Sequence, residues 1–166
     1  LSSGAIQTPK ILMKNNLIKK PHPLQFHLNV KIFAEFNFKI NAENSTILTK
    51  HIREFENENV LMMTSNFNNS INAAGLSHFN TDLIEKFIQN NEKSAVFNLQ
   101  FKPTFSHAKF IKFLNMSYLK WSLSDRDFDD VKKYLKELIK IIFISEPIKI
   151  YLPIIDSDPI KNSQDA

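Results

Sequence analysis

Cationic and aromatic side chains alternate between residues 102 and 121. Lysine ammonium groups bind phosphates as point charges, and planar aromatic rings stack on unpaired bases. This mixture therefore suits contact with RNA. Alternatively, the rings belong to the core and the lysines to a solvated face, which is the commoner arrangement in proteins. The rings include Phe105, Phe110 and Trp121, and the cations expected to bind RNA are Lys102, His107, Lys109, Lys112 and Lys120.

A second group of cations lies near the N-terminus, where no acid accompanies it. The formal charge of +4 divides into +4 for residues 1–23, +2 for residues 24–155 and −2 for residues 156–166. A basic arm on a nearly neutral body suits binding to a phosphate backbone or an acidic surface, and equally suits a tail that is merely soluble. The arm lysines expected to bind RNA are Lys10, Lys14, Lys19 and Lys20.

Other chemistry finds little support in the residue pattern. The absence of cysteine excludes disulfides and thiolate nucleophiles, and the five histidines never occur at metal-site spacing. Neither Gly4 nor Gly75 lies in a phosphate-binding loop. Residues 125–129 begin like a calcium loop, but Asp130 replaces its glycine and Lys136 its closing glutamate. We therefore predict a protein that is not an enzyme and holds no metal or cofactor.

One long strand must position these residues. From residue 24 to residue 40 every even position is apolar, and the odd positions are polar apart from Phe33. Because successive side chains of a strand point to opposite faces, this pattern predicts a half-buried strand with one dry face. The apolar positions are Leu24, Phe26, Leu28, Val30, Ile32, Ala34, Phe36, Phe38 and Ile40.

The middle of the chain is expected to alternate between helices and strands. Helical spacing of apolar residues predicts a helix over 44–59, on the dry face of the first strand, and a second helix over 81–90. Short strands are expected over 60–63 and 97–101. Residues 106–123 fit both a helix and a strand, with a strand expected over at least the later part.

The last helix has the clearest pattern. Ser124 followed by Asp127 matches a capping arrangement, and Pro147 precedes a closing strand over 148–152. Over 127–142 an apolar stripe and a row of lysines lie on opposite sides, which predicts an amphipathic helix. The stripe consists of Phe128, Val131, Leu135, Leu138, Ile139 and Ile142.

These elements predict one α+β domain. The expected fold is a two-layer ferredoxin-like sandwich with a mainly antiparallel sheet and helices on one face. Its organisation is a basic arm over 1–23, a single domain over 24–155 with an insertion at about 64–93, and an acidic tail over 156–166. No apolar run approaches membrane-spanning length.

This layout resembles the family of small-subunit ribosomal protein ten. In that family a strand enters a long loop around a Ser-Pro-His-Val element, and a helix and strand close the chain. Here residues 96–101 correspond to the entering strand, residues 102–105 (Lys-Pro-Thr-Phe) to the loop element, and residues 119–123 to the returning strand. Pro103 is the matched residue of the element, and the family's loop arginines are replaced by lysines.

The resemblance implies a structural subunit in the head of a small ribosomal subunit. It would contact rRNA with its loop and neighbouring ribosomal proteins with its sheet, and the AT-rich codon bias of the composition suits a mitochondrial ribosome. The alternative is an accessory subunit of another large assembly, such as a respiratory complex, and the alternative location is the cytoplasm. Salt-sensitive RNA binding that depends on the loop lysines distinguishes the two functions.

Overall fold

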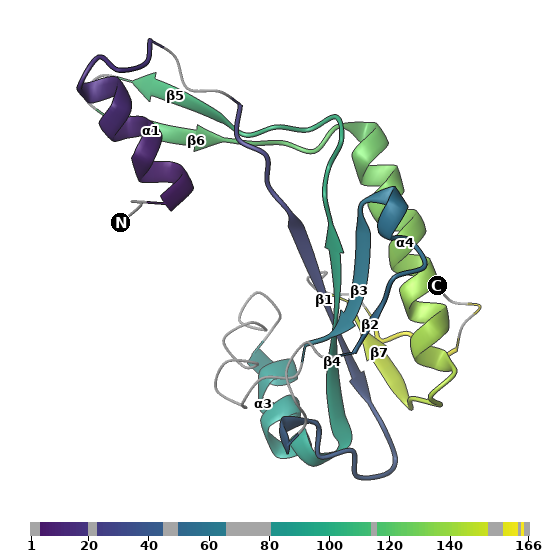
Figure 1. Ribbon diagram of the computed structural model, residues 1–166. Helices are drawn as coiled ribbons and strands as arrows, with labels where there is room; N and C mark the ends of the chain where they lie inside the picture. The colour runs from purple at the N-terminus through teal and green to yellow at the C-terminus, as the bar shows by residue number, and fades with distance from the viewer. Residues whose placement is uncertain are drawn as a thin grey trace. The chain divides into compact units, whose positions relative to one another are not determined.

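A computed structural model describes residues 4–19, 23–44, 50–65, 81–113, 116–152, 158–162 and 164. The chain divides into two compact units (Figure 1). The first contains the described residues of 1–27 and 102–129, and the second contains those of 28–101 and 130–166. Each unit therefore combines segments that are distant in the sequence.

The second unit is built on a five-stranded antiparallel sheet with the order β2-β3-β4-β1-β7. β1 and β4 pair along their whole length, from Leu28 opposite Phe101 to Glu35 opposite Ser94. The prediction of mixed helix and sheet structure with antiparallel strands is confirmed. The strands are β1 (Leu28–Glu35), β2 (His51–Ile52), β3 (Val60–Thr64), β4 (Ser94–Phe101) and β7 (Lys149–Tyr151).

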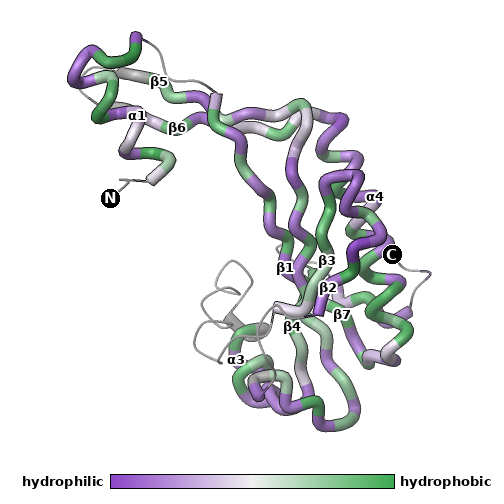
Figure 2. Tube along the Cα trace, in the orientation of Figure 1, coloured by the Kyte–Doolittle hydropathy of each residue, from purple (hydrophilic) through white to green (hydrophobic). Residues whose placement is uncertain are grey.

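Helix α4 spans Asp125–Phe143, and the part of the helix that belongs to the second unit covers one face of this sheet. Figure 2 shows hydrophobic and hydrophilic stretches alternating along α4, as expected for a helix with one buried side. Phe128, which the sequence pattern assigns to the apolar stripe, is half exposed. The buried helix residues, which join Ile32, Ala34 and Leu99 in one core, are Val131, Tyr134, Leu138, Ile139 and Ile142.

Helix α3 (Thr81–Gln89) packs against the opposite face, so the prediction that the helices lie on one face is wrong. Phe87 of α3 is buried against Phe33 of β1 and Val96 of β4. Side chains alternate along a strand, so Phe33 points away from the face that carries Ile32. Phe33 is the apolar exception at an odd position of the first strand. It gives the second face a dry patch for a helix to cover.

The helix predicted over 44–59 does not form in the part of this segment that the structure describes. Residues 45–49 lie outside it, and the neighbouring residues form the 3-10 turns η1 (Ala42–Asn44) and η2 (Glu56–Glu58) around β2. Phe55 packs on Tyr134 of α4, with ring centroids 5.5 Å apart. Asn59 then adopts the left-handed conformation, with φ at 63°. A short strand and a turn therefore satisfy the same apolar spacing.

The first unit contains helix α1 (Gly4–Lys14) and a hairpin of β5 (Lys109–Phe113) and β6 (Met116–Lys120). The hairpin decides the ambiguous segment 106–123 in favour of strands. The helix in the N-terminal arm was not predicted, since it contains Pro9 and buries none of its residues. Within the predicted insertion over 64–93, residues 66–80 lie outside the described residues.

Candidate nucleic-acid interface

Two lysines lie opposite each other in the hairpin of the first unit. Lys109 of β5 pairs with Lys120 of β6 in the antiparallel register, and both side chains are exposed. Directly opposite residues have Cβ atoms roughly 4.5–5.5 Å apart, so like charges at such a pair destabilise the hairpin. Neither lysine forms a salt bridge with an acid among the residues that the structure describes. The hairpin therefore holds two neighbouring positive charges without an acidic partner in the described part of the chain.

The base of the hairpin is fastened to residues 24–26. Leu24 and Ala108 exchange two backbone hydrogen bonds, with N–O distances of 2.8 and 2.9 Å. The Phe26 ring packs against Trp121, with centroids 5.4 Å apart and ring planes at 60°. Trp121 nevertheless keeps 54% of its surface exposed. The indole is thus supported by a neighbour and still accessible.

The buried carboxylate of Asp127 joins the turn before the hairpin to the first turn of α4. It accepts hydrogen bonds from the backbone N–H groups of Thr104 (2.9 Å) and Phe105 (3.1 Å), and from the hydroxyls of Ser106 (2.5 Å) and Ser124 (2.9 Å). Burial raises the pKa of Asp127, but these hydrogen bonds outweigh it and hold the pKa below its ordinary value. The predicted cap is confirmed, because the Ser124 hydroxyl accepts from the Asp127 N–H at 3.1 Å.

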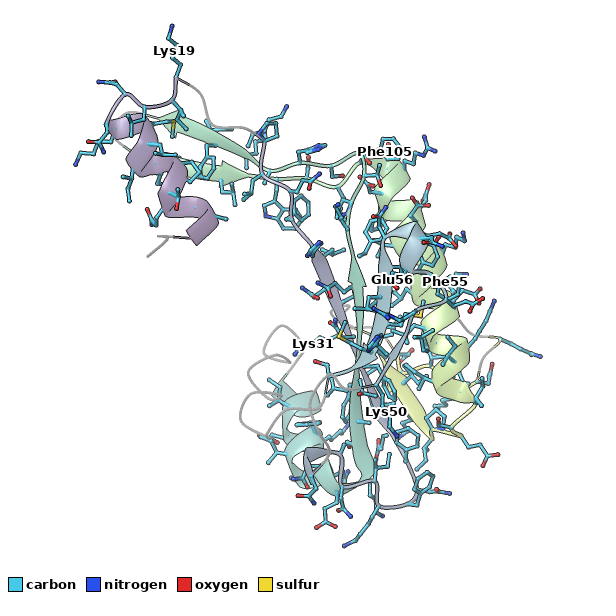
Figure 3. All side chains as sticks on the ribbon, in the orientation of Figure 1. Lys19, Lys31, Lys50, Phe55, Glu56 and Phe105 are labelled. Atoms are coloured by element: carbon cyan, nitrogen blue, oxygen red, sulfur yellow. The ribbon has the colours of Figure 1, made fainter. Side chains whose placement is uncertain are left out.

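Phe105 presents a second accessible ring, which lies at the start of α4 in Figure 3. Its side chain is 49% exposed, and the Arg126 guanidinium lies 4.3 Å from the ring centroid. This is a cation–π contact, and guanidinium groups and aromatic rings are both groups that contact nucleic acids. Sequence reasoning missed Arg126, because it follows the run over 102–121 and no local spacing connects it with Phe105.

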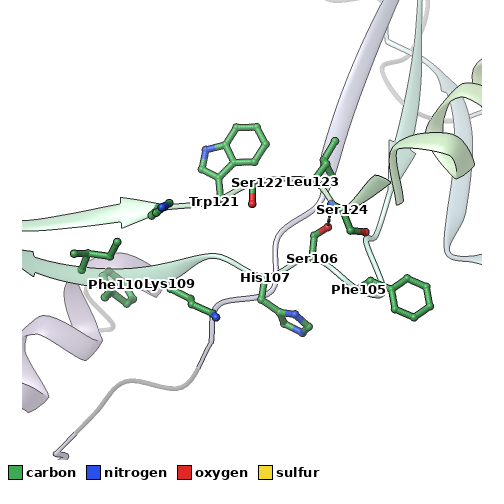
Figure 4. Close-up of a pocket in the computed structure, with 11 residues that line it drawn as sticks. Phe105, Ser106, His107, Lys109, Phe110, Trp121, Ser122, Leu123 and Ser124 are labelled. Carbon is green, nitrogen blue, oxygen red and sulfur yellow. Dashed lines mark hydrogen bonds between the residues drawn. The ribbon is translucent and has the colours of Figure 1, made fainter. Parts of the chain in front are cut away.

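A hollow of about 530 Å³ lies along the two chain segments at the hairpin base (Figure 4). Its volume falls within the range of roughly 300–1,000 Å³ that is usual for small-ligand sites. Figure 4 shows the Trp121 indole and the His107 imidazole pointing to opposite sides of these segments. The Ser124 N–H donates to the Ser106 hydroxyl at 2.8 Å and joins the segments. The cations and rings of the lining are His107, Lys109, Lys120, Phe105, Phe110 and Trp121.

The other predicted RNA-binding residues that the structure describes also belong to the first unit. The arm and the segment 102–120, which are separate groups in the sequence, are thus brought into one compact unit. Lys20 and the side chain of Lys112 lie outside the described residues. Of the rest, Lys10 and Lys102 are half-buried, whereas Lys14 and Lys19 are exposed, and Lys19 projects away from the chain in Figure 3.

The formal charge of the chain is divided unevenly between the two units. Residues 1–27 and 102–129 hold nine Lys and Arg against three Asp, a net charge of +6. Residues 28–101 and 130–166 hold twelve basic against fourteen acidic residues, a net charge of −2. One of the three acids of the first unit, Asp127, is fully buried. Positive charge therefore dominates the unit that carries the exposed rings.

Metal sites and membrane spans find no support in the described residues. Among them, no group of three His, Asp or Glu side chains is arranged to hold a metal ion. No helix in the described part of the chain has the length and apolar character needed to cross a bilayer.

In the comparisons with known proteins, no family model matches the sequence and no curated protein matches it significantly. The geometry of the first unit therefore carries the functional argument.

Proposed function

We propose that this chain is a structural, non-enzymatic subunit that binds RNA through its first unit. One observation carries the proposal: a net charge of +6 coincides with the unit whose hairpin pairs two exposed lysines and whose base presents two half-exposed rings. Phosphates are attracted by such a field, and unpaired bases stack on such rings.

The pairing of Lys109 with Lys120 supports an anionic partner on physical grounds. Like charges directly opposite each other in a hairpin destabilise it, by roughly 0.2–1 kcal/mol for a cross-strand pair. A phosphate placed between the two ammonium groups would replace this repulsion by two attractions. The repulsion between the two lysines costs stability in the free protein, and RNA binding would relieve it.

We further propose a place in the head of a small ribosomal subunit, contacting rRNA and neighbouring ribosomal proteins, with a mitochondrial location. The sheet supports a divergent ferredoxin-like relationship. β4 and β7 run in the same direction with β1 between them, and α4 belongs to their connection. β1 and β3 likewise share a direction on either side of β4, although no α-helix lies in the described part of their connection.

The hairpin supplies a further point of agreement with this proposal. It lies between β4 and α4, where the ribosomal family has its long RNA-contacting loop. The lysines that replace the loop arginines of the family are exposed at Lys109 and Lys120. They remain suitable for phosphate, since lysine binds it as a point charge.

Titration of labelled single-stranded RNA, followed by fluorescence anisotropy at several salt concentrations, tests the proposal. The variant Lys109→Ala/Lys120→Ala should bind more weakly, and its slope of log affinity against log salt should shrink by roughly 0.7 for each phosphate that the protein no longer neutralises. The matched control is Lys86→Ala/Lys136→Ala, which removes two exposed lysines from α3 and α4 in the second unit. The control should bind as the unaltered protein does.

Two results would count against the proposal. If both double variants weaken binding equally, the attraction is a general effect of net charge. If the unaltered protein does not bind RNA at low salt, the chain is better explained as a protein-binding accessory subunit of another assembly, such as a respiratory complex. Sedimentation of the native protein with small-subunit rRNA tests the ribosomal placement separately.

A further inference from the structure

We infer that the hollow at the hairpin base takes one unpaired nucleotide of an RNA strand, with Trp121 as the surface on which its base stacks. Lys109 and Lys120 would bind phosphates of the same RNA strand. This inference rests on the proposed RNA-binding function, and it names the structural state of the RNA that the site accepts.

The ring of Trp121 is arranged as a stacking surface. The indole keeps 54% of its surface exposed, so a base can reach it. Phe26 packs against the indole at a centroid distance of 5.4 Å, and residues 24–26 are themselves held by the hydrogen bonds between Leu24 and Ala108. The indole is therefore positioned before a ligand arrives, so less conformational entropy is lost on binding.

The charges around the hollow fit a phosphate. Lys109 and Lys120 line the same hollow as Trp121, and no Asp or Glu is among its lining residues. Lys109 and Lys120 share one face of the hairpin, and Trp121, the next residue after Lys120, alternates to the other side. Each ammonium group ends a flexible four-carbon stem, so the two lysines can bind phosphates further along an RNA strand whose base is held on the indole. Two acids lie in the first turn of α4, outside this lining. The Asp127 carboxylate is buried and accepts hydrogen bonds from its own surroundings, and Asp125, next to Ser124, is exposed.

The geometry favours an unpaired strand over a duplex. A base inside a duplex has both faces covered by its neighbours, so a protein ring can stack on it only after the base leaves the helix. Single strands offer free base faces without that cost, and stacking on aromatic side chains tolerates every base. We therefore expect little sequence preference and a clear preference for single strands.

Trp121 is the sole tryptophan of the chain, so its fluorescence reports on this position alone. Unlabelled oligouridine added to the unaltered full chain should quench this fluorescence at the concentrations at which labelled oligouridine binds by anisotropy. An RNA duplex of the same length should bind more weakly and leave the emission nearly unchanged. This measurement needs no substitution, so it does not depend on a variant folding.

Two variants sharpen the test. Trp121→Phe keeps a ring against Phe26 and should bind single strands within a few fold of the unaltered chain. Trp121→Leu keeps an apolar side chain without a stacking face and should weaken binding roughly 5- to 150-fold, the range for removal of one base-stacking ring. If RNA binds while Trp121 fluorescence stays constant, or if single strands and duplexes bind equally, the inference fails and the proposed function stands. If neither RNA binds at low salt, the proposed function itself fails.

Discussion

The ring of Phe87 on α3 meets the ring of Phe33 on β1 edge to face, with centroids 5.0 Å apart and planes at 77°. Both side chains are 2% exposed, and with Val96 they form a small cluster separate from the main core. An edge-to-face pair contributes about 0.5–1.5 kcal/mol beyond its buried area. This contact fastens α3 to the sheet face opposite α4.

Removing the Phe87 ring should release α3 without unfolding the main core. Phe87→Ala should lower the free energy of unfolding by about 3 kcal/mol, the lower end for a buried phenylalanine, since the cluster is small. Hydrogen exchange should speed up in α3 more than in α4. The control Ile88→Ala alters a half-exposed neighbour on the same helix and should change stability by less than about 0.5 kcal/mol. An equal decrease of protection in both helices would contradict the separate role of the cluster.

The Asp127 carboxylate should contribute stability that disappears in acid. Its pKa is lowered in the folded chain, so its contribution is complete above the ordinary pKa near 3.8 and is lost as the pH falls through the folded value. At neutral pH, Asp127→Asn should lower the free energy of unfolding by about 1.5–3 kcal/mol, the range for hydrogen bonds to a charged group. Urea unfolding at neutral and acidic pH should show this deficit shrinking in acid. The exposed neighbour variant Asp125→Asn should show a smaller deficit, and a deficit that is independent of pH would refute the assignment.

Tyr151 should stay protonated well into the alkaline range. Burial raises its pKa to about 12, helped by the charge of Glu35, to which its hydroxyl donates a hydrogen bond at 3.3 Å. An unfolded tyrosine ionises near 10, so the contribution of the neutral phenol to stability is complete below about pH 10 and is lost as the pH rises through about 12. Tyrosinate absorbance measured against pH should show a late step that Tyr151→Phe removes. Glu35→Gln should move that step to lower pH, and a step unaffected by either change would exclude this pair as its origin.

Reversing one charge of the hairpin should separate folding from binding. Lys109→Glu places a carboxylate opposite Lys120, so the cross-strand pair becomes attractive and stabilises the hairpin by roughly 0.2–1 kcal/mol. The same change puts a negative charge at the proposed phosphate site and should weaken RNA binding beyond the effect of Lys109→Ala. Denaturation and anisotropy measured on the same preparation check both directions. A variant that loses stability and affinity together would instead indicate a structural role for Lys109.

The sequence correctly predicts the elements whose apolar residues all pack against one neighbouring element. The apolar side of β1, with Ile32 and Ala34, shares one core with the apolar stripe of α4. The stripe contributes Val131, Leu138 and Ile142. The local pattern and the tertiary packing therefore agree. Asparagine adopts the left-handed conformation more readily than other non-glycine residues, so it suits turns in a chain with two glycines. Among the described residues, three of the four non-glycine positions with positive φ are Asn16, Asn41 and Asn59.

The remaining features depend on contacts between distant residues, which a single sequence does not reveal. The spacing of Ile52 and Phe55 fits a helix as well as a short strand and turn, and the contact of Phe55 with Tyr134 belongs to the second alternative. Likewise, the candidate interface depends on contacts of residues 24–26 with the base of the hairpin, about 80 to 95 residues further along the chain. The lysines of the site were visible in the sequence, but Arg126 and the support of Trp121 by Phe26 were not.

The paired backbone hydrogen bonds between Leu24 and Ala108 imply a threshold when the chain is shortened from its N-terminal side. Deletion up to residue 23 removes α1 and the four arm lysines but leaves this attachment and the ring beside Trp121 in place. Deletion through Phe26 removes both, although only three more residues are deleted. Tolerance to trimming, and resistance of the hairpin to proteases, should therefore change abruptly at Leu24 rather than decline gradually with length.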